Sequence, residues 1–189
     1  MESSSLNRFE KRIGSGQVIT FRPFEIKEDL VRLHEWMHKD HVIPFWQLNV
    51  PFSRLKRHME KAVANEHQLL WIGCLDDVPL SYWETYEVKE DVIGKYYRYH
   101  SQDRGIHLLI GPEFYIGRGL AEPFVKAMVD FEFTKRKATK IVAEPDITNK
   151  KMIHVFQKCG FQPIKPITLP EKRALLMIYH RHHWKGRGL

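Results

Sequence analysis

The segment from Gly105 to Phe161 holds the residues whose types and spacing best suit chemistry. Gly117-Arg118-Gly119 follows an apolar run, Ile106–Ile110, and precedes a helical pattern that starts near Leu120. Glycines let a bulky anion approach the backbone, and a helix start offers unpaired N–H groups and the positive end of its dipole. Two glycines two apart also occur in ordinary loops, but this context favours a phosphate-binding loop.

Two titratable side chains flank this loop in the sequence. His107 alternates with apolar neighbours along one predicted strand, and Asp146 follows the next predicted strand, Lys140–Glu144. If the two strands are neighbours, both polar groups lie at the strand ends where ligands collect in open α/β sheets. The alternatives are a structural histidine and an aspartate that only caps the helix beginning near Asn149.

The order of strand, glycine loop, helix, strand and helix resembles the GNAT N-acetyltransferase superfamily. Asn149, followed by a helix that ends at Gly160-Phe161, adds to the resemblance, which covers nearly the whole chain. It is closest to the siderophore-biosynthesis branch, which includes the mycobactin lysine N-acyltransferase and the aerobactin hydroxylysine acetyltransferase. The motifs that carry it are His34-Glu35-Trp36-Met37, Pro44-Phe45-Trp46, Tyr82-Trp83-Glu84-Thr85-Tyr86, Ile93-Gly94-Lys95-Tyr96-Tyr97 and Gly105-Ile106-His107-Leu108-Leu109-Ile110-Gly111.

The resemblance implies an α/β (α+β) fold with a mixed central sheet of about six to seven strands and helices on both faces. It also implies acetyl-CoA, or a longer acyl-CoA, as co-substrate and no metal. An acyl carrier protein is the alternative donor. The implied coenzyme contacts are Leu109, Gly117, Arg118, Gly119, Leu120, Ala121 and Asn149.

The same resemblance implies direct acyl transfer to the amine or hydroxylamine of a lysine-derived or polyamine siderophore precursor. Asp146 is then the general base, and His107 orients the acceptor or helps to deprotonate it. The implied acceptor contacts are His107, Trp46, Trp83 and Glu84.

Phe156 departs from the family pattern. GNAT enzymes usually have a tyrosine seven residues after the asparagine, where it protonates the departing thiolate, and phenylalanine has no proton to give. A coenzyme A thiol resembles that of cysteine, with a pKa of about 8 to 9, so it can leave as the thiolate at modest cost. The departure weakens a tyrosine-acid mechanism but not the prediction of acyl transfer.

Length and composition fit one domain. The chain has 189 residues and a formal net charge of +7, which suits a polyphosphate coenzyme, an acidic carrier protein or nucleic acid equally well. We expect a loose tail over residues 1–16 and a single acyltransferase domain over residues 17–189. Strands are expected at 18–23, 68–75, 80–88 and 139–144, with a C-terminal pair at 161–166 and 173–179, and helices at 29–38, 53–65 and 120–135.

Cysteine usage and hydropathy point to a cytoplasmic protein. Cys74 and Cys159 both fall in apolar segments, and two cysteines are too few for a disulfide framework. The N-terminus lacks the apolar stretch of a signal peptide, and no run is long enough to span a bilayer. We therefore expect a soluble monomer or homodimer that acts on small molecules, not on membranes or nucleic acids.

Three rival functions stay open on the sequence. An aminoglycoside N-acetyltransferase shares much of the same pattern. His34-Glu35-x-x-His38 matches the helix of zinc hydrolases, in which two histidines bind the metal and the glutamate acts as base. The C-terminal run His180–Arg187 is rich in histidine and arginine, as in some nucleic-acid-binding or metal-binding tracts, although a charged tail is the simpler explanation.

Overall fold

The structure is a computed structural model that describes residues 8–186. The described residues form eight strands: β1 Phe9–Arg12, β2 Val18–Pro23, β3 Gln68–Leu75, β4 Val78–Glu87, β5 Arg104–Ile110, β6 Lys140–Ala143, β7 Gln162–Thr168 and β8 Arg173–His180. The α-helices are α1 Ile26–Met37, α2 Ile43–Trp46, α3 Phe52–Val63, α4 Ala121–Thr134 and α5 Lys150–Lys158. Single 3-10 turns are η2 Val88–Glu90, η3 Val92–Lys95, η4 Glu113–Tyr115 and η5 Arg181–His183.

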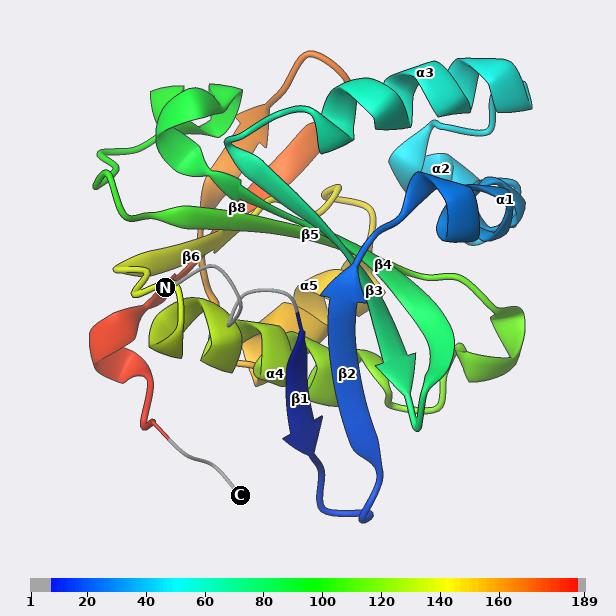
Figure 1. Ribbon diagram of the computed structural model, residues 1–189. Helices are drawn as coiled ribbons and strands as arrows, with labels where there is room; N and C mark the ends of the chain where they lie inside the picture. The colour runs from blue at the N-terminus through cyan, green and yellow to red at the C-terminus, as the bar shows by residue number, and fades with distance from the viewer. Residues whose placement is uncertain (1–7, 187–189) are drawn as a thin grey trace. The chain divides into compact units, whose positions relative to one another are not determined.

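The strands pair in the order β1-β2-β3-β4-β5-β6-β8-β7 (Figure 1). β5 and β6 run parallel, whereas β1 with β2, β2 with β3, β6 with β8, and β7 with β8 run antiparallel. This is the mixed α/β sheet that the sequence predicts. It has eight strands rather than six or seven.

The additional strand comes from the expected tail. Phe9–Arg12 forms β1 and pairs with β2, from Phe9 opposite Phe21 to Arg12 opposite Val18. The Phe9 ring stacks on that of Phe21, with centroids 6.4 Å apart. The prediction of a loose tail is therefore wrong for β1, because the strand satisfies its backbone groups on the edge of β2; residues 1–7 lie outside the described part.

The chain divides into two compact units. The first runs up to Glu84 and includes Leu108–Leu120; the second comprises Thr85–His107 and the chain from Ala121 onward. β4 and β5 contribute residues to both. The single domain expected over residues 17–189 stays a prediction.

The first unit is built on two amphipathic helices and an antiparallel sheet. α1 and α3 lie side by side (Figure 1). Their apolar residues recur at helical spacing and are buried with Ile72 of β3: Leu30, Leu33 and Met37 on α1, and Leu55 and Met59 on α3. A two-residue turn, Asp76-Asp77, joins β3 to β4 with φ values of 49° and 64°, the left-handed pair that suits a tight hairpin. The strands expected at 68–75 and 80–88 are thus joined as a hairpin, and the second begins earlier than expected, at Val78.

The second unit surrounds helix α4, which is apolar on nearly every side. Phe124, Val125, Met128, Phe131 and Phe133 are all buried, as expected of a helix that lies within a core. α5 packs against α4 (Figure 1), and Asn149 caps α5 by accepting a hydrogen bond from the Met152 N–H at 3.2 Å. β7 and β8 form the predicted antiparallel pair.

Candidate active site

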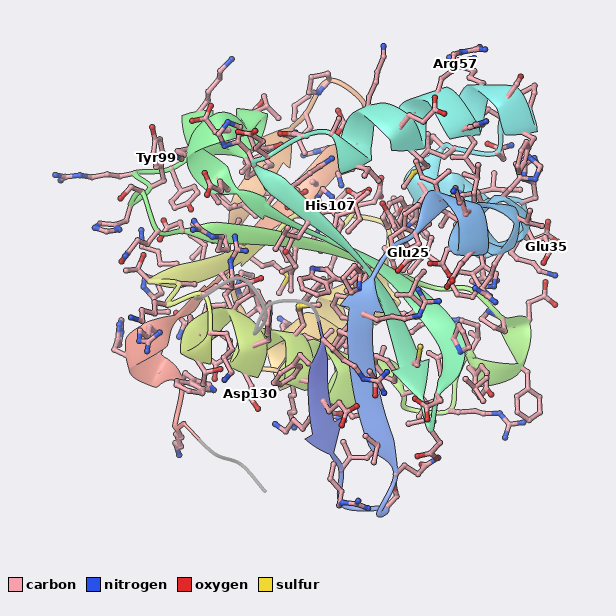
Figure 2. All side chains as sticks on the ribbon, in the orientation of Figure 1. Glu25, Glu35, Arg57, Tyr99, His107 and Asp130 are labelled. Carbon is pink, nitrogen blue, oxygen red and sulfur yellow. The ribbon has the colours of Figure 1, made fainter. Side chains whose placement is uncertain are left out.

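A histidine and a buried carboxylate pair in the second unit and form its candidate reaction centre. His107 on β5, labelled in Figure 2, is hydrogen-bonded through Nε2 to Oε1 of Glu144, which follows β6. The His107 side chain is 32% exposed and that of Glu144 is 4% exposed. One partner is therefore open to a substrate, and the other is held behind it.

The strand register explains why these two side chains meet. β5 and β6 are parallel, and Gly105 lies opposite Val142. His107 lies two residues after Gly105, and Glu144 lies two residues after Val142, just past the end of β6. Both side chains are on the same face of the sheet, because alternate residues of a strand share a face. The pairing thus follows from the sheet itself and needs no unusual backbone.

Tyr86 completes the surroundings of the carboxylate. Its hydroxyl donates to Glu144 Oε2 at 3.0 Å and lies 3.5 Å from His107 Nε2. Its ring lies directly over Gly105, where an added Cβ would come within 2.0 Å of the ring. Only glycine at position 105 lets Tyr86 take this place.

The charge state of Glu144 follows from these contacts. Burial pushes the pKa of Glu144 upward, but its interactions with His107, the charge of Lys172 and the hydrogen bond of Tyr86 together hold this pKa below its usual value. Glu144 is therefore ionised and only accepts hydrogen bonds. His107 Nε2 must carry the donated proton, so the neutral ring has its lone pair on Nδ1.

Asp146 is engaged differently from the sequence-based expectation. Its Oδ1 accepts hydrogen bonds from the Thr148 N–H at 2.8 Å and the Thr148 hydroxyl at 2.5 Å, an arrangement typical of aspartate in a turn. The carboxylate observed on His107 is that of Glu144, which sequence reasoning missed. The available signal was a glutamate that ends an otherwise apolar strand, directly before Pro145.

The glycine loop belongs to the first unit. Gly117 and Gly119 both have φ of +76°, and an added Cβ at either position would meet nothing within 4 Å. The left-handed backbone favours glycine, and the open space leaves the main chain accessible to an anion. Arg118 lies over the Phe114 ring at 3.8 Å and donates from Nε to the Phe114 carbonyl at 2.6 Å, so its guanidinium is held within the loop.

The other predicted coenzyme residues have ordinary structural surroundings. The Leu109 side chain is buried in the core of the first unit, and Leu120 and Ala121 are half-buried where the loop runs into α4. Asn149 caps α5 in the second unit. Their contacts with a coenzyme stay predictions.

In the first unit, Tyr82 contacts two of the predicted acceptor residues, Trp46 and Glu84. The Trp46 ring packs edge-on against Tyr82 with centroids 5.6 Å apart, and the Tyr82 hydroxyl donates to Glu84 at 2.9 Å. Burial raises the pKa of Tyr82 well above its usual value, so the phenol stays a donor. Trp83 is 0% exposed and donates its indole N–H to Ser81 at 2.9 Å, which leaves its side chain no surface for an acceptor.

The His34-Glu35-x-x-His38 motif shows no sign of a metal centre. His34 Nε2 contacts the Val50 carbonyl at 3.1 Å, and His38 Nδ1 contacts the His34 carbonyl at 2.8 Å. Figure 2 shows Glu35 on the outer side of α1. Within residues 8–186, no three histidine, cysteine or acidic side chains are grouped to hold a metal ion, so the zinc-hydrolase alternative gains no support from this part of the chain.

The start of the histidine-rich C-terminal run is folded against the second unit. Arg181 donates to the carbonyls of Phe133 and Ala138, and the Trp184 indole N–H donates to Asp130 at 2.8 Å. The simple picture of a charged tail therefore fails for residues 181–184. As for membranes, the helices within the described residues are all too short or too polar to cross one.

The cysteines are buried rather than activated. Burial raises the pKa of Cys159 to about 12 and also raises that of Cys74. Low thiolate content disfavours either residue as a nucleophile, in agreement with direct transfer.

Comparison with known proteins identifies the type of domain. A family model described as an acetyltransferase (GNAT) domain matches residues 25–169. The N(6)-hydroxylysine O-acetyltransferase of Escherichia coli is 28% identical over 94% of this chain and 56% of its own length. The N-hydroxyputrescine acetyltransferase of Acinetobacter baumannii is 34% identical over 85% of this chain and 76% of its own length. The chain thus spans little more than half of the first of these relatives.

Solved structures agree with the fold. An uncharacterized protein from Bacillus halodurans is 46% identical and superposes with a TM-score of 0.90, covering 94% of this chain and 92% of its own. The aminoglycoside acetyltransferase AAC(6′)-Ib, in complex with paromomycin and acetyl-CoA, is 25% identical with a TM-score of 0.79 and covers 87% of this chain and 94% of its own.

Proposed function

Because this chain belongs to the GNAT acetyltransferase family, we propose that it is an acyl-CoA-dependent N-acyltransferase. The acceptor is the amine or hydroxylamine of a lysine-derived or polyamine siderophore precursor. The observation that carries the proposal is the pairing of half-exposed His107 with buried Glu144. The two relatives named for hydroxylysine and hydroxyputrescine acetylation support this acceptor class.

In the proposed reaction the acceptor nitrogen attacks the thioester carbonyl directly. The C–N bond forms and the C–S bond breaks, so that an amide and coenzyme A are the products. The proton lost by the nitrogen passes to His107 Nδ1, while Glu144 fixes the ring and stabilises the imidazolium that forms. Coenzyme A leaves as a thiolate and takes its proton from the imidazolium or from water.

The absence of a tyrosine acid at position 156 is compatible with this scheme. Phe156 is buried and packs against Phe161, with ring centroids 4.9 Å apart. A thiolate whose conjugate thiol has a pKa of about 8 to 9 is a tolerable leaving group. The departing thiolate therefore needs no tyrosine acid, and the His107 imidazolium or water can supply its proton.

Asp146 is kept as a second candidate for the base. It lies two residues beyond Glu144, and its carboxylate is held by Thr148. In the scheme favoured here His107 takes the proton and Asp146 shapes the turn that follows β6. Substitution of the two carboxylates one at a time distinguishes these roles.

The donor-binding part of the proposal rests on the glycine loop. Gly117 and Gly119 have the left-handed backbone and open surroundings of a phosphate cradle. We propose that the coenzyme pyrophosphate binds the main chain from Gly117 to Ala121, with Asn149 toward the pantetheine. For the acceptor, Glu84 is proposed as the partner of a cationic amine, beside Trp46.

A matrix of donors and acceptors tests the proposed function. Acetyl-CoA, longer acyl-CoA and a carrier-bound acyl group are each offered with lysine, N6-hydroxylysine, putrescine, N-hydroxyputrescine and an aminoglycoside, and thiol release is measured. We expect the highest kcat/KM with acyl-CoA and a hydroxylated lysine or diamine. Preference for the aminoglycoside would transfer the chain to the alternative favoured by its likeness to AAC(6′)-Ib, and no thiol release with any pair would overturn the proposal.

A further inference from the structure

The turn between β7 and β8 brings a lysine to the carboxylate that holds His107. Lys172 Nζ lies 4.0 Å from Glu144 Oε1, the same oxygen that His107 contacts. The Lys172 side chain is 16% exposed, and Glu144 is almost wholly buried. Charges in such surroundings are screened by solvent far less than a surface pair.

The backbone of the turn fixes the lysine in place. The Leu169 N–H donates to the Lys172 carbonyl at 2.9 Å and closes the turn. The Leu169 side chain is buried in the core of the second unit. Lys172 therefore directly precedes β8 in an anchored turn, which brings its side chain toward Glu144.

The charge balance has a consequence for His107. A carboxylate whose sole cationic neighbour is a histidine stabilises the imidazolium and raises the histidine pKa. An imidazolium has no lone pair and cannot accept a proton from an amine. Lys172 adds a permanent positive charge, so His107 faces a nearly balanced ion pair instead of a bare anion.

We propose that Lys172 lowers the proton affinity of His107 and so keeps the imidazole neutral, and able to act as a base, near pH 7. Lys172 is thus a positioning residue that acts through Glu144. The inference rests on the proposed function for its consequence in catalysis, but not for the charge effect itself.

Other titratable groups near the pair act in the opposite direction or are neutral. Asp91, at the start of η3, interacts electrostatically with Glu144, His107 and Glu171. These acidic groups favour the imidazolium, whereas Tyr86 contributes a neutral hydroxyl. Lys172 is the cation that opposes them at Glu144.

Two variants and a matched control test the inference. Lys172→Met removes the charge, Lys172→Arg keeps it, and Lys165→Met removes an exposed lysine from β7 of the same hairpin. The His107 titration is followed by NMR of its imidazole carbons, and the acid limb of kcat/KM is measured over pH 5 to 10. We expect Lys172→Met to raise both midpoints by about one pH unit or more, with rates that approach the unmodified protein at high pH. Lys172→Arg and Lys165→Met should keep the original midpoints.

A rate that falls equally at every pH, with an unchanged NMR midpoint in folded Lys172→Met, would overturn the inference. If that variant does not fold, Lys172→Gln takes its place under the same criterion. The NMR midpoint needs no turnover, so it separates two failures. A shifted midpoint supports the effect of the Lys172 charge on His107, whatever the activity of His107→Ala. Retained activity in His107→Ala would instead refute His107 as the base.

Discussion

Glu144 and Glu132 are two buried carboxylates of the same unit with opposite surroundings. Glu144 has hydrogen bonds from His107 and Tyr86 and the nearby charge of Lys172, and its pKa is held below the usual range. Glu132, on α4, is 0% exposed. Neither of its carboxyl oxygens has a hydrogen-bond partner of normal geometry within residues 8–186.

Burial raises the pKa of Glu132 to about 7. The charges of Arg136 and Arg104 and an interaction with Thr85 lower this pKa, but they offset the effect of burial only in part. Burial thus raises the pKa of a carboxylate toward physiological pH, whereas converging donors keep the group ionised. The donors around Glu144 are consistent with the role proposed for it beside His107. Glu132 instead costs stability whenever it ionises.

The largest loss of activity is expected when the histidine is removed. His107→Ala should lower kcat/KM at least about 100-fold, because it removes the group proposed to take the proton. Thiol release with acetyl-CoA and a hydroxylated diamine or lysine gives the measurement. His58→Ala, an exposed histidine on α3, is the control, and near-normal turnover of His107→Ala would refute the assignment.

A smaller effect on activity is expected from a substitution that disturbs binding of the acyl-CoA donor and leaves the charges around His107 unchanged. Gly119→Ala forces a side chain into a backbone with φ of +76°, which costs roughly 1 kcal/mol and shifts the loop. The KM for acetyl-CoA should rise about tenfold, equivalent to 1.4 kcal/mol, without movement of the acid limb of the pH profile.

Gly16→Ala supplies the matched control for the loop. Gly16 has φ of +84° and open surroundings, like Gly119, but lies in the turn between β1 and β2. An equal rise in KM for both variants would show that general backbone strain, not coenzyme binding, is responsible.

The smallest effect on turnover is expected from a substitution of the second buried carboxylate, Glu132. Glu132→Gln should leave kcat/KM within about twofold, yet change the pH dependence of stability. Glu132 binds a proton more tightly in the folded than in the unfolded chain, so its contribution to stability falls as pH rises from about 4.5 to about 7. Urea unfolding at pH 4 and pH 8 should show the variant gaining about 3 kcal/mol relative to the original protein over that range; equal pH dependence of the two proteins would mean that Glu132 has an ordinary pKa.

Much of the fold follows from the sequence pattern. Helical spacing predicted α1 and α3, and strand-forming composition predicted β3 and β4, because these signals act over a few residues. The GNAT family and the mixed sheet are likewise confirmed. β1 was missed, since a four-residue edge strand of mixed charge gains its order from β2 rather than from its own composition.

The site was harder to predict, because it depends on register. Sequence reasoning identified His107 but joined it to Asp146, which lies beyond the strand end. The contact with Glu144 requires the alignment of Gly105 with Val142 across two parallel strands, and no local pattern encodes that alignment. Trp83 was expected to contact the acceptor, and in the structure its ring is buried against that of Phe21, with centroids 5.3 Å apart.

Kinetics of two carboxamide variants separate the roles of Glu144 and Asp146. Glu144→Gln and Asp146→Asn each keep the shape of the side chain and remove its charge, and kcat is measured for both at saturating acyl-CoA and acceptor. If Glu144 holds His107 as the base, Glu144→Gln should lose at least about tenfold in kcat, as removal of an orienting carboxylate does elsewhere, and Asp146→Asn should lose clearly less. A large loss in Asp146→Asn with near-normal turnover in Glu144→Gln would contradict the account and make Asp146 the base.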